Sequence, residues 1–506
     1  MEAYTPIEED YKKSNGEIIP KGTILTEPYR EWDGYVNLCM DKKSFILTYS
    51  GLIPKIISYL KEKGYEYKVE KIYNSNNIEI KDIKLNGMEL RYYQKEAVEI
   101  GKKKKRGIFA VATGGGKSEI LFKLTADIQL KTLIMVNRIT LFKQLIKRFK
   151  NRMGLKDGEI NVICGEDKFY DPKNRITIAT FQSLYVADKK KKIILKHEEV
   201  LKSAEMIHVD ESQYISLNEL GMVLKKCTKA SHRFSYSATP KREDGFDDML
   251  EAHIGPIIYY KGISDLIKEG YLSKPKIYMM KFPYYLDKPM TYKSAYKYFM
   301  KNEDKNKVMA DIAYKFAKIG KSVLLSFTRI EHLKLVYKIL KNMNNLNLTI
   351  KTVIGEDTTA DKEEALLKLD TKEFNIVLST LFGVGVDVPN LDILVLADSS
   401  KSIIYTTQQV GRVLRMVQGK TPIIIDFMDY NTFDGNRKEE DLLNMNDNDN
   451  MDFLNEDIEV SEDDDIEVKD YFKSYSKLRY KFYKSEPEFE THIIDNIDGI
   501  EEINSK

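Results

Sequence analysis

Short runs of apolar residues recur along most of the chain and alternate with longer stretches of helical periodicity. The runs hold four to seven residues, are rich in Val, Ile and Leu, and fall into two series. Such runs, separated by helices, are typical of parallel strands buried on both faces of a sheet. The pattern therefore predicts an α/β chain with two tandem parallel-sheet domains. The first series comprises residues 107–113, 132–136, 176–180, 206–210 and 234–239, and the second comprises 323–327, 352–355, 376–380, 393–397 and 422–427.

The segments outside the two series have different patterns. The N-terminal residues contain the single tryptophan and a helical pattern over 52–65, which predicts a small α+β domain and a candidate DNA-binding module. An acidic stretch near the C-terminus has few aromatic residues and no periodicity, which predicts a disordered segment. The predicted division is 1–86 for the N-terminal domain, 87–255 and 281–436 for the two sheet domains, 256–280 for a linker, 437–470 for the acidic segment and 471–506 for a C-terminal tail.

The net charge is an average over unlike parts of the chain. The 506 residues include 80 Lys and Arg against 78 Asp and Glu, so the formal net charge is +2. Residues 439–470 hold fifteen acidic residues and one basic residue, a local charge of −14, and residues 471–506 add −1. Residues 1–438 therefore carry +17, which favours a polyanionic partner for the body of the chain.

Composition argues against several classes of protein. Hydrophobic residues make up 42% of the chain and charged residues 31%, which allows a sizeable buried core. The sequence has no run of eighteen apolar residues, and its acidic start differs from a signal peptide. Cys39, Cys164 and Cys227 lie far apart, which argues against a disulfide framework or a zinc finger. We expect a reduced, soluble protein without a membrane partner.

A glycine-rich loop follows the first apolar run. Residues 114–118 read Gly-Gly-Gly-Lys-Ser and lead into a helical pattern. In a strand–loop–helix of this kind, backbone N–H groups curl round phosphates and the helix dipole favours their negative charge. Lys117 would reach the β- and γ-phosphates and Ser118 would hold Mg²⁺. The strict pattern has glycine where this sequence has Val111, so a flexible turn is the alternative interpretation.

Two carboxylates end another apolar run. Asp210 and Glu211 follow residues 206–209, at the edge where a parallel sheet would also carry the glycine-rich loop. Asp210 would hold Mg²⁺, and Glu211 would orient or deprotonate a water molecule. An isolated Asp-Glu pair is usually solvated surface, and the presence of Lys117 is what favours the catalytic interpretation.

Taken together, these segments resemble superfamily-2 helicases and translocases over about residues 86–430. Nine motifs occur in the order of that family, and such an ordered series is very specific. They are the adenine-side motif (90–97), motif I (114–118), motif Ia (136–144), motif Ic (180–184), motif II (210–213), motif III (237–240), motif IV (323–328), motif V (379–390) and motif VI (408–415).

The resemblance implies two RecA-like motor domains, ATP and Mg²⁺ as cofactors, and a role for each matched residue. The catalytic set is Lys117, Glu211, Arg412 and Arg415, with the two arginines spaced to lie on one side of a helix. Mg²⁺ is assigned to Ser118 and Asp210. The remaining ATP-binding set is Arg91, Gln94, Thr113, Gly114, Gly115, Gly116, Gln213, Gly385 and Asp387. For Gly385 and Asp387, an ordinary turn after a strand is the alternative interpretation. The nucleic-acid contacts are Arg138, Thr180, Gln182, Thr328 and Thr380, and the coupling residues are Ser237, Thr239 and Gln408.

Two residues narrow the resemblance within the superfamily. Motif II ends in Gln213 and motif VI begins with Gln408, which disfavours the DEAD-box RNA helicases. The sequence is more similar to RecG-like, XPB-like and type III restriction motors. Within that branch the N-terminal segments and the C-terminal tail resemble the UvsW-type helicases of tailed phages, which act on branched DNA. A cytoplasmic location follows, in the host cell if the chain is phage-encoded.

The resemblance leaves three functions open. The first is an ATP-dependent DNA helicase that translocates on DNA and unwinds or branch-migrates forks and junctions in replication, recombination or repair. The second is a duplex-DNA translocase or an RNA helicase without branch preference, because contacts to the nucleic-acid backbone serve DNA and RNA alike. The third is an ATP-dependent clamp that binds nucleic acid without unwinding it.

Three features outside the motifs have competing interpretations. Trp32, with Arg30 and Tyr35 nearby, is either a stacking residue for a base at a branch point or a buried core residue. The basic run 102–106 is either a solvated helix end or a nucleic-acid patch. The acidic residues 439–470 are a passive spacer, an autoinhibitory mimic of nucleic acid, or the binding site of a protein partner.

Overall fold

The chain folds into two compact units in the computed structural model. Unit 1 comprises residues 1–111 and 116–260, and unit 2 comprises residues 112–115 and 261–506. The residues that the structure describes are 11–12, 18–19, 25–26, 30–31, 38–41, 46–68, 81–165, 167–187, 193–239, 242, 245–285, 292–343, 347–382, 388–431 and 471–500.

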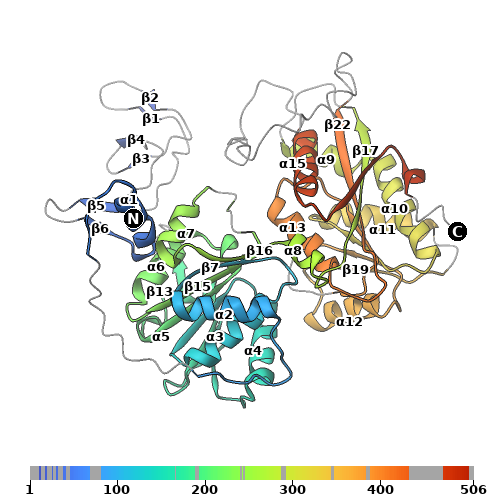
Figure 1. The fold of residues 1–506 in the computed structure, drawn as a ribbon. Coiled ribbons are helices and arrows are strands. Elements are labelled where there is room, and N and C mark those ends of the chain that lie inside the picture. Colours follow the sequence, from blue (N-terminus) through green and yellow to red (C-terminus); the bar gives the residue numbers. More distant parts are fainter. Residues whose placement is uncertain are drawn as a thin grey trace. The chain divides into compact units, whose positions relative to one another are not determined.

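Unit 1 is built round an eight-stranded sheet with the order β10-β9-β11-β8-β14-β15-β7-β16 (Figure 1). Neighbours from β9 to β7 run parallel, and β10 pairs antiparallel with β9. Parallel neighbours need crossover connections, which the helical stretches between the apolar runs supply. The strands are β7 (Arg106–Val111), β8 (Thr132–Val136), β9 (Ile160–Cys164), β10 (Asp167–Phe169), β11 (Ile176–Thr180), β14 (Met206–Asp210), β15 (His232–Ser237) and β16 (Ile257–Lys261).

Helices cover both faces of this sheet (Figure 1). Alternate residues of β8 show the reason, because Ile134 and Val136 belong to one core cluster while Leu133 and Met135 belong to the other. A strand with apolar side chains on both faces is stable only between two layers. The first cluster contains α2 (Tyr92–Lys104), α3 (Lys117–Ile128) and α4 (Ile139–Met153), and the second contains α5 (Glu198–Ser203), α6 (Leu217–Lys226) and α7 (Asp247–Ile254).

The described parts of the first 68 residues form small elements, some of which are anchored on α7. A Cβ on Gly51 would lie 2.0 Å from the Glu251 carbonyl oxygen, so the backbones meet closely there. Lys55 forms ion pairs with Asp248 (2.6 Å) and Glu251 (2.9 Å). The elements are the antiparallel pairs β1 (Tyr11–Lys12) with β2 (Ile18–Ile19), β3 (Leu25–Thr26) with β4 (Arg30–Glu31), and β5 (Cys39–Asp41) with β6 (Ile46–Thr48), followed by η1 (Ser50–Leu52) and α1 (Ile53–Glu62).

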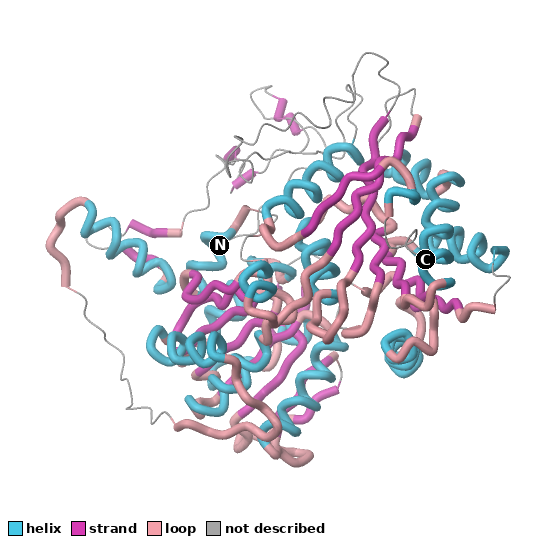
Figure 2. The backbone as a smooth tube through the Cα atoms, turned by 45° about the vertical axis from the view of Figure 1, so that its right-hand side comes forward, coloured by secondary structure: helices cyan, strands magenta, loops and turns pink. Residues whose placement is uncertain are grey.

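Unit 2 is built round a seven-stranded sheet, whose strands lie side by side in Figure 2. Their order is β19-β20-β18-β21-β22-β17-β23, and all neighbours run parallel. Its strands are β17 (Lys276–Tyr284), β18 (Val323–Ser326), β19 (Ile350–Val353), β20 (Ile376–Ser379), β21 (Ile393–Leu396), β22 (Ile423–Asn431) and β23 (Glu490–Ile494). Its helices include α8 (Ile263–Lys268), α9 (Tyr292–Met300), α10 (Glu303–Lys318), α11 (Ile330–Met343), α12 (Thr359–Asp370), α13 (Ile403–Val413) and α15 (Tyr471–Ser485). The two sheets confirm the predicted fold class of two RecA-like domains.

The C-terminal tail differs from its prediction because it belongs to the second sheet. Helix α15 packs on β22 and α13, and β23 pairs with β17 at the sheet edge (Figure 1). The buried residues of α15 include the aromatic Phe472, Tyr475 and Tyr483 together with Ser476 and Arg479. The aromatic residues follow a helical spacing, but such a pattern does not predict the burial of the cation Arg479.

The predicted linker 256–280 also contains regular structure. Strand β16 joins the first sheet, α8 follows it, and β17 begins the second sheet at Lys276. The predicted disordered segment 437–470 lies outside the described residues. In the part of the chain that the structure describes, no helix is both long and apolar enough to span a membrane.

Candidate nucleotide site and nucleic-acid interface

The glycine-rich loop connects the end of β7 with the start of α3. Gly114 and Gly116 both have φ +83°, a conformation that L side chains rarely adopt. Gly115 N donates to Ala112 O (2.9 Å), so the loop is a tight turn before the helix. Val111, where the strict pattern has glycine, is the buried last residue of β7 and needs no special backbone conformation. The loop and helix N-terminus have the geometry of an anion cradle.

Lys117 is the first residue of α3, and its ammonium group reaches back to the end of β7. Its Nζ donates to the Val111 carbonyl (3.3 Å) and lies 3.6 Å from Glu211 Oε1. Ser118 follows directly on the helix. The structure therefore brings together Lys117 and Glu211, which are far apart in sequence, at the carboxyl edge of the sheet.

Asp210 ends β14, and Glu211 turns the chain away from the sheet with φ +51°. This left-handed conformation is held by a hydrogen bond from Glu211 N to the Tyr236 carbonyl (2.9 Å). Burial raises the pKa of Asp210 to about 7, with the Glu211 charge acting in the same direction and the Lys117 charge opposing it. A buried carboxyl group with a raised pKa ionises more easily when a cation binds next to it, which suits a cation-binding site.

Gln94 packs against the glycine-rich loop from α2. Its Oε1 accepts a hydrogen bond from Arg91 N (2.9 Å), and the Arg91 guanidinium donates to Tyr93 Oη (2.9 Å). A Cβ on Gly116 would lie only 2.2 Å from Gln94 Nε2. The adenine-side motif and motif I are therefore in direct contact within unit 1.

Three oxygens in motifs I, II and III test whether a nucleotide fits. Within the described part of the chain, Thr113 Oγ1, Gln213 Oε1 and Thr239 Oγ1 are buried without a hydrogen-bond partner. Buried polar atoms normally have one, so these atoms indicate groups that await a polar ligand. Ser237 Oγ bonds to the backbone of Thr239 and closes a local turn. With the hydroxyl of Ser118 and the carboxylate of Asp210, this set has the oxygen chemistry that ATP with Mg²⁺ requires.

A second group of predicted residues meets at the ends of β8 and β11, which are parallel neighbours. Gln182 Nε2 donates to the Asn137 backbone carbonyl (3.1 Å) and also bonds to its side chain. Arg138 lies over the Tyr214 ring (5.8 Å to the centroid). Thr180 begins the short turn that carries Gln182. The sequence interpretation missed Asn137 and Tyr214, although Asn137 directly follows an apolar run, as Asp210 does.

The two predicted threonines of unit 2 follow β18 and β20. Thr328 Oγ1 bonds to Tyr296 Oη (2.9 Å), and its backbone N donates to Asp398. Asp398 also accepts from Tyr296 Oη (2.7 Å) and bonds to His332 Nδ1 (3.2 Å). Burial opposes ionisation of Asp398, but these hydrogen bonds outweigh it and lower its pKa. Thr380 N donates to the Val353 carbonyl (3.1 Å). Asp398 was missed from the sequence.

The motif VI arginines do not share one helix, so the prediction that both lie on one helical face is wrong. Gln408 is buried within α13, and Arg412 is in its last turn. Arg415 lies beyond the helix end and forms an antiparallel bridge with Leu272. The Leu414 carbonyl accepts from Ser273 N (2.7 Å), so pairing with this segment ends the helix before Arg415.

Some sequence predictions fall outside the described residues. Gly385 and Asp387 of motif V are among them, as are Trp32, Tyr35 and the acidic segment. Their assigned roles stay predictions.

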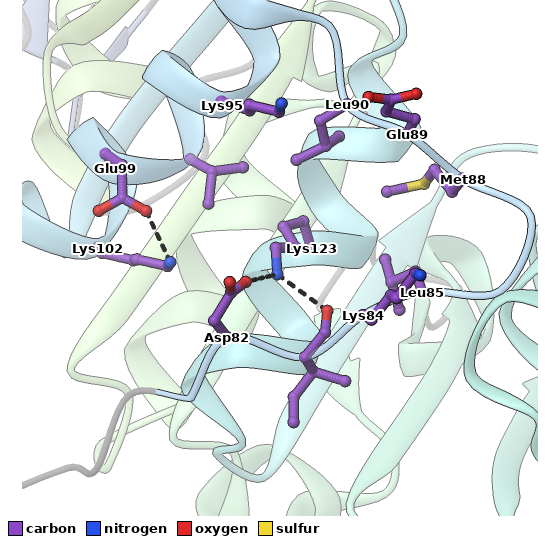
Figure 3. A pocket seen from close by; sticks show the side chains of 12 residues that line it. Asp82, Lys84, Leu85, Met88, Glu89, Leu90, Lys95, Glu99, Lys102 and Lys123 are labelled. Atoms are coloured by element: carbon purple, nitrogen blue, oxygen red, sulfur yellow. Dashed lines mark hydrogen bonds and ion pairs between the residues drawn. The ribbon is translucent and has the colours of Figure 1, made fainter.

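A pocket of about 560 Å³ lies between residues 82–90 and helices α2 and α3 (Figure 3). Two of its lysines form ion pairs: Lys123 bonds to Asp82 and to Asp127 (2.9 Å), and Lys102 bonds to Glu99 (2.7 Å) and to Asp127 (2.8 Å). Residues 82–86, predicted as the end of the N-terminal domain, are thus fastened to the first sheet domain. Neither Gln94 nor the glycine-rich loop lines this pocket.

Two family matches agree with these sites. Residues 87–242 match the family described as type III restriction enzyme, res subunit, and residues 304–417 match the helicase conserved C-terminal domain. The first match contains motifs I to III, and the second contains motifs IV to VI.

Individual relatives agree with these family matches. The chain is 26% identical to the DNA 3'-5' translocase XPB2 of Sulfurisphaera tokodaii, over 69% of this chain and 83% of the relative. It is 25% identical to the ATP-dependent DNA helicase uvsW of Enterobacteria phage T4, over 78% of this chain and 80% of the relative. A solved fragment of a putative HsdR subunit of a type I restriction enzyme from Vibrio vulnificus has a TM-score of 0.52 at 19% identity, covering 74% of this chain and 68% of that one, which shows the fold.

Two parallel-sheet domains with helicase motifs at their edges define a nucleic-acid-dependent ATPase. The chain belongs to the superfamily-2 helicases, close to XPB and UvsW.

Proposed function

We propose that this chain is an ATP-dependent DNA helicase that translocates on DNA and unwinds or branch-migrates forks and junctions. The observation that carries the proposal is the arrangement at one edge of the first sheet. The Lys117–Glu211 pair stands at the glycine-rich loop, and Arg138 and Gln182 stand at the ends of the neighbouring strands. The DNA helicase and DNA translocase among the relatives support DNA as the partner.

In the proposed ATP site, the glycine-rich loop of Gly114, Gly115 and Gly116 surrounds the phosphates. Lys117 neutralises charge on the β- and γ-phosphates, and Glu211 orients the attacking water. Gln94 and Arg91 recognise the base side of the nucleotide, and Thr113 and Gln213 hydrogen-bond to it.

Ser118 and Asp210 are the residues that would hold Mg²⁺. The bound ion would neutralise charge between the β- and γ-phosphates. The Lys117 charge already opposes the raised pKa of Asp210, and added positive charge would favour the carboxylate further.

Arg412 and Arg415 are proposed to neutralise the charge that develops as the γ-phosphate leaves. Gly385 and Asp387 are proposed to contact the sugar and this arginine pair. Closure on ATP and release after hydrolysis would then move the motor along a strand. Ser237, Thr239 and Gln408 would couple the two events.

The strand would be held by its backbone. Arg138, Thr180 and Gln182 in unit 1 and Thr328 and Thr380 in unit 2 offer charged and neutral donors for phosphate oxygens. Phosphate contacts fix position without reading sequence, so binding should tolerate any sequence and weaken with salt. The charge of +17 on residues 1–438 supports this mode of binding.

Action at a branch needs an element that is fixed to the motor and meets the junction. Residues 50–62 are fixed in this way, because Gly51 packs on the backbone of α7 and Lys55 pairs with Asp248 and Glu251. Arg106 at the start of β7 also bonds to Ser50. The N-terminal domain is therefore our candidate for the element that separates strands.

The test is ATP hydrolysis in the presence of forked duplex, linear duplex, single-stranded DNA and RNA. We expect forked DNA to stimulate hydrolysis most and RNA least. Equal stimulation by all four, with no separation of the fork, would reject the branched-DNA function.

A second candidate is a duplex-DNA translocase without branch preference, which the name of the XPB2 relative favours. It predicts equal stimulation by forked and linear duplex. RNA helicase activity predicts the highest rate with RNA. A non-unwinding clamp predicts that a variant unable to hydrolyse ATP, Lys117→Ala, keeps full biological activity.

A further inference from the structure

Arg479 of α15 is a fully buried cation, with 1% of its side chain exposed. Its Nε and one terminal nitrogen form a two-point ion pair with Asp426 (2.8 and 3.1 Å). That nitrogen also donates to the Phe427 carbonyl (2.9 Å). The other terminal nitrogen donates to the Ser400 carbonyl (2.9 Å). One planar guanidinium therefore ties the C-terminal helix to β22 and to the loop before α13.

This loop determines where α13 begins. Ser402 caps the helix by accepting a hydrogen bond from Tyr405 N (3.0 Å), two residues after the carbonyl that Arg479 holds. Ser399 bonds to Asp429, which is paired with the buried Lys305. The first two residues of the turn into α13, Ser399 and Ser400, are thus fixed by buried charged groups.

A buried ion pair is a poor way to gain stability, since apolar residues of the same volume often serve as well. What the guanidinium adds is a fixed orientation, because its planar set of donors binds several acceptors in one plane. Helix α13 carries Gln408 and Arg412, so Arg479 fixes the orientation of motif VI.

We propose that Arg479 is a positioning residue for motif VI: it holds the loop 399–402 so that α13 presents Arg412 in its working orientation. The inference rests on the proposed function, in which Arg412 acts on the γ-phosphate. It makes the C-terminal segment 471–500 a working part of the motor, although that segment carries no helicase motif.

The test compares steady-state ATP hydrolysis, with saturating forked DNA, by the full chain and its variants. Arg479→Lys keeps the charge near Asp426 but lacks the fork that reaches Ser400. We expect kcat to fall about 10- to 100-fold, as misplacement of a reacting group does. The KM for ATP and the affinity for DNA should stay within about twofold, because neither depends on Arg412 in the ground state.

The matched control is Tyr483→Phe. The Tyr483 hydroxyl donates to the same Asp426 carboxylate (2.8 Å) and not to the loop. This variant should melt at a lower temperature, as Arg479→Lys does, but keep the wild-type kcat. An equal loss of kcat in both variants would mean that Arg479 only stabilises the fold, and the inference would be rejected.

A double variant makes the test specific. If Arg479 acts through Arg412, the kcat of Arg479→Lys with Arg412→Ala equals that of Arg412→Ala alone. Multiplied losses would reject the inference. Should Arg479→Lys fail to fold, Ser399→Ala perturbs the same loop more gently and must show the same non-additivity.

The wild-type chain and Arg412→Ala separate this inference from the proposed function. A wild-type chain without DNA-stimulated hydrolysis, or a fully active Arg412→Ala variant, would overturn both. An active wild type, an inactive Arg412→Ala and an unaffected Arg479→Lys would overturn the inference alone.

Discussion

Charged side chains at the carboxyl edge of the first sheet are partly exposed. In the second sheet domain, the charged side chains between α10 and β22 are buried and paired with one another. The side chains of Lys117 and Glu211 are 12% and 19% exposed and lie 3.6 Å apart. Those of Lys305 and Asp429 are 1% and 0% exposed and in contact. The charges at this edge of the first sheet remain accessible, whereas the buried charges of the second sheet fix its own loops.

The buried polar groups behind the first site are correspondingly neutral. His208 bonds to Thr125 (3.2 Å) and Tyr236 Oη (2.9 Å), and so links α3, β14 and β15. Burial lowers the pKa of His208 to about 3, so this residue carries no charge near neutral pH. The neutral His208 therefore adds no charge to the site, where Lys117, Glu211 and Arg148 act on Asp210.

The largest effect should come from Lys117→Ala. Removing the cation that we propose contacts the phosphates should lower kcat for ATP hydrolysis by at least about 10²–10³-fold. The free energy of unfolding should change by less than about 1 kcal/mol, because the ion pair of this partly exposed group with Glu211 is long (3.6 Å). ATPase rates and urea denaturation measure the two quantities.

Lys123→Ala on the same helix is the control. Lys123 pairs with the buried Asp127, so its loss should lower stability and leave kcat near that of the wild type. The reverse pattern in these two variants would contradict the division between ligand-binding and structural charges.

The next largest effect should come from Asp426→Asn in unit 2. This change leaves the Arg479 cation buried without a counter-charge and should lower the free energy of unfolding by about 3–5 kcal/mol. Urea denaturation, followed by far-UV circular dichroism, measures this free energy of unfolding. The control Glu490→Gln breaks the exposed Lys276–Glu490 contact (3.9 Å) and should cost less than about 1 kcal/mol. Equal costs would show that burial does not distinguish the pairs.

A smaller and more local effect is expected for Gly116→Ala. The added Cβ would meet Gln94 Nε2 at 2.2 Å, at a φ of +83°. The Gln94 amide must move away and the left-handed backbone is strained, so kcat/KM for ATP should fall roughly 10- to 100-fold. In Gly165→Ala the φ is also positive (+60°) but the space is open, so kinetics should not change. Similar losses in both variants would argue against a packed phosphate loop.

The smallest effect should come from Arg138→Ala. Losing one phosphate contact should weaken binding to all sequences alike and reduce the slope of log K against log salt concentration by about 0.7–0.9. Fluorescence anisotropy over a salt series measures the slope. Lys103→Ala, in the exposed part of the basic run, is the control and should leave the slope unchanged if this run is a solvated helix end.

The apolar runs predicted both sheets because a parallel strand is buried on two faces and therefore has a continuous apolar sequence. Helix α15 has aromatic residues at helical spacing on its buried face, but that face also contains Arg479 and Ser476. A cation that becomes buried by pairing with Asp426 has no signature in a pattern of hydrophobic positions.

For the site, residues at the ends of apolar runs were predictable one strand at a time. Which strand ends meet depends on strand order, and Tyr214 reaches Arg138 because β14 is next to β8. Asp398 directly follows the run 393–397, so its position gave a signal, but its partner Thr328 comes from another strand. The C-terminal end of α13 was not predictable, because it depends on a hydrogen bond from Ser273 N to the Leu414 carbonyl, and Ser273 is far away in the sequence.

Strand separation of a forked duplex by the full chain tests the central claim most directly. With ATP and Mg²⁺ present, the wild type should separate the fork faster than a linear duplex of the same sequence. Glu211→Gln should bind the same fork with unchanged affinity and separate none of it. The account would be contradicted if the wild type bound the fork and hydrolysed ATP without separating strands, or if Glu211→Gln separated them at the wild-type rate.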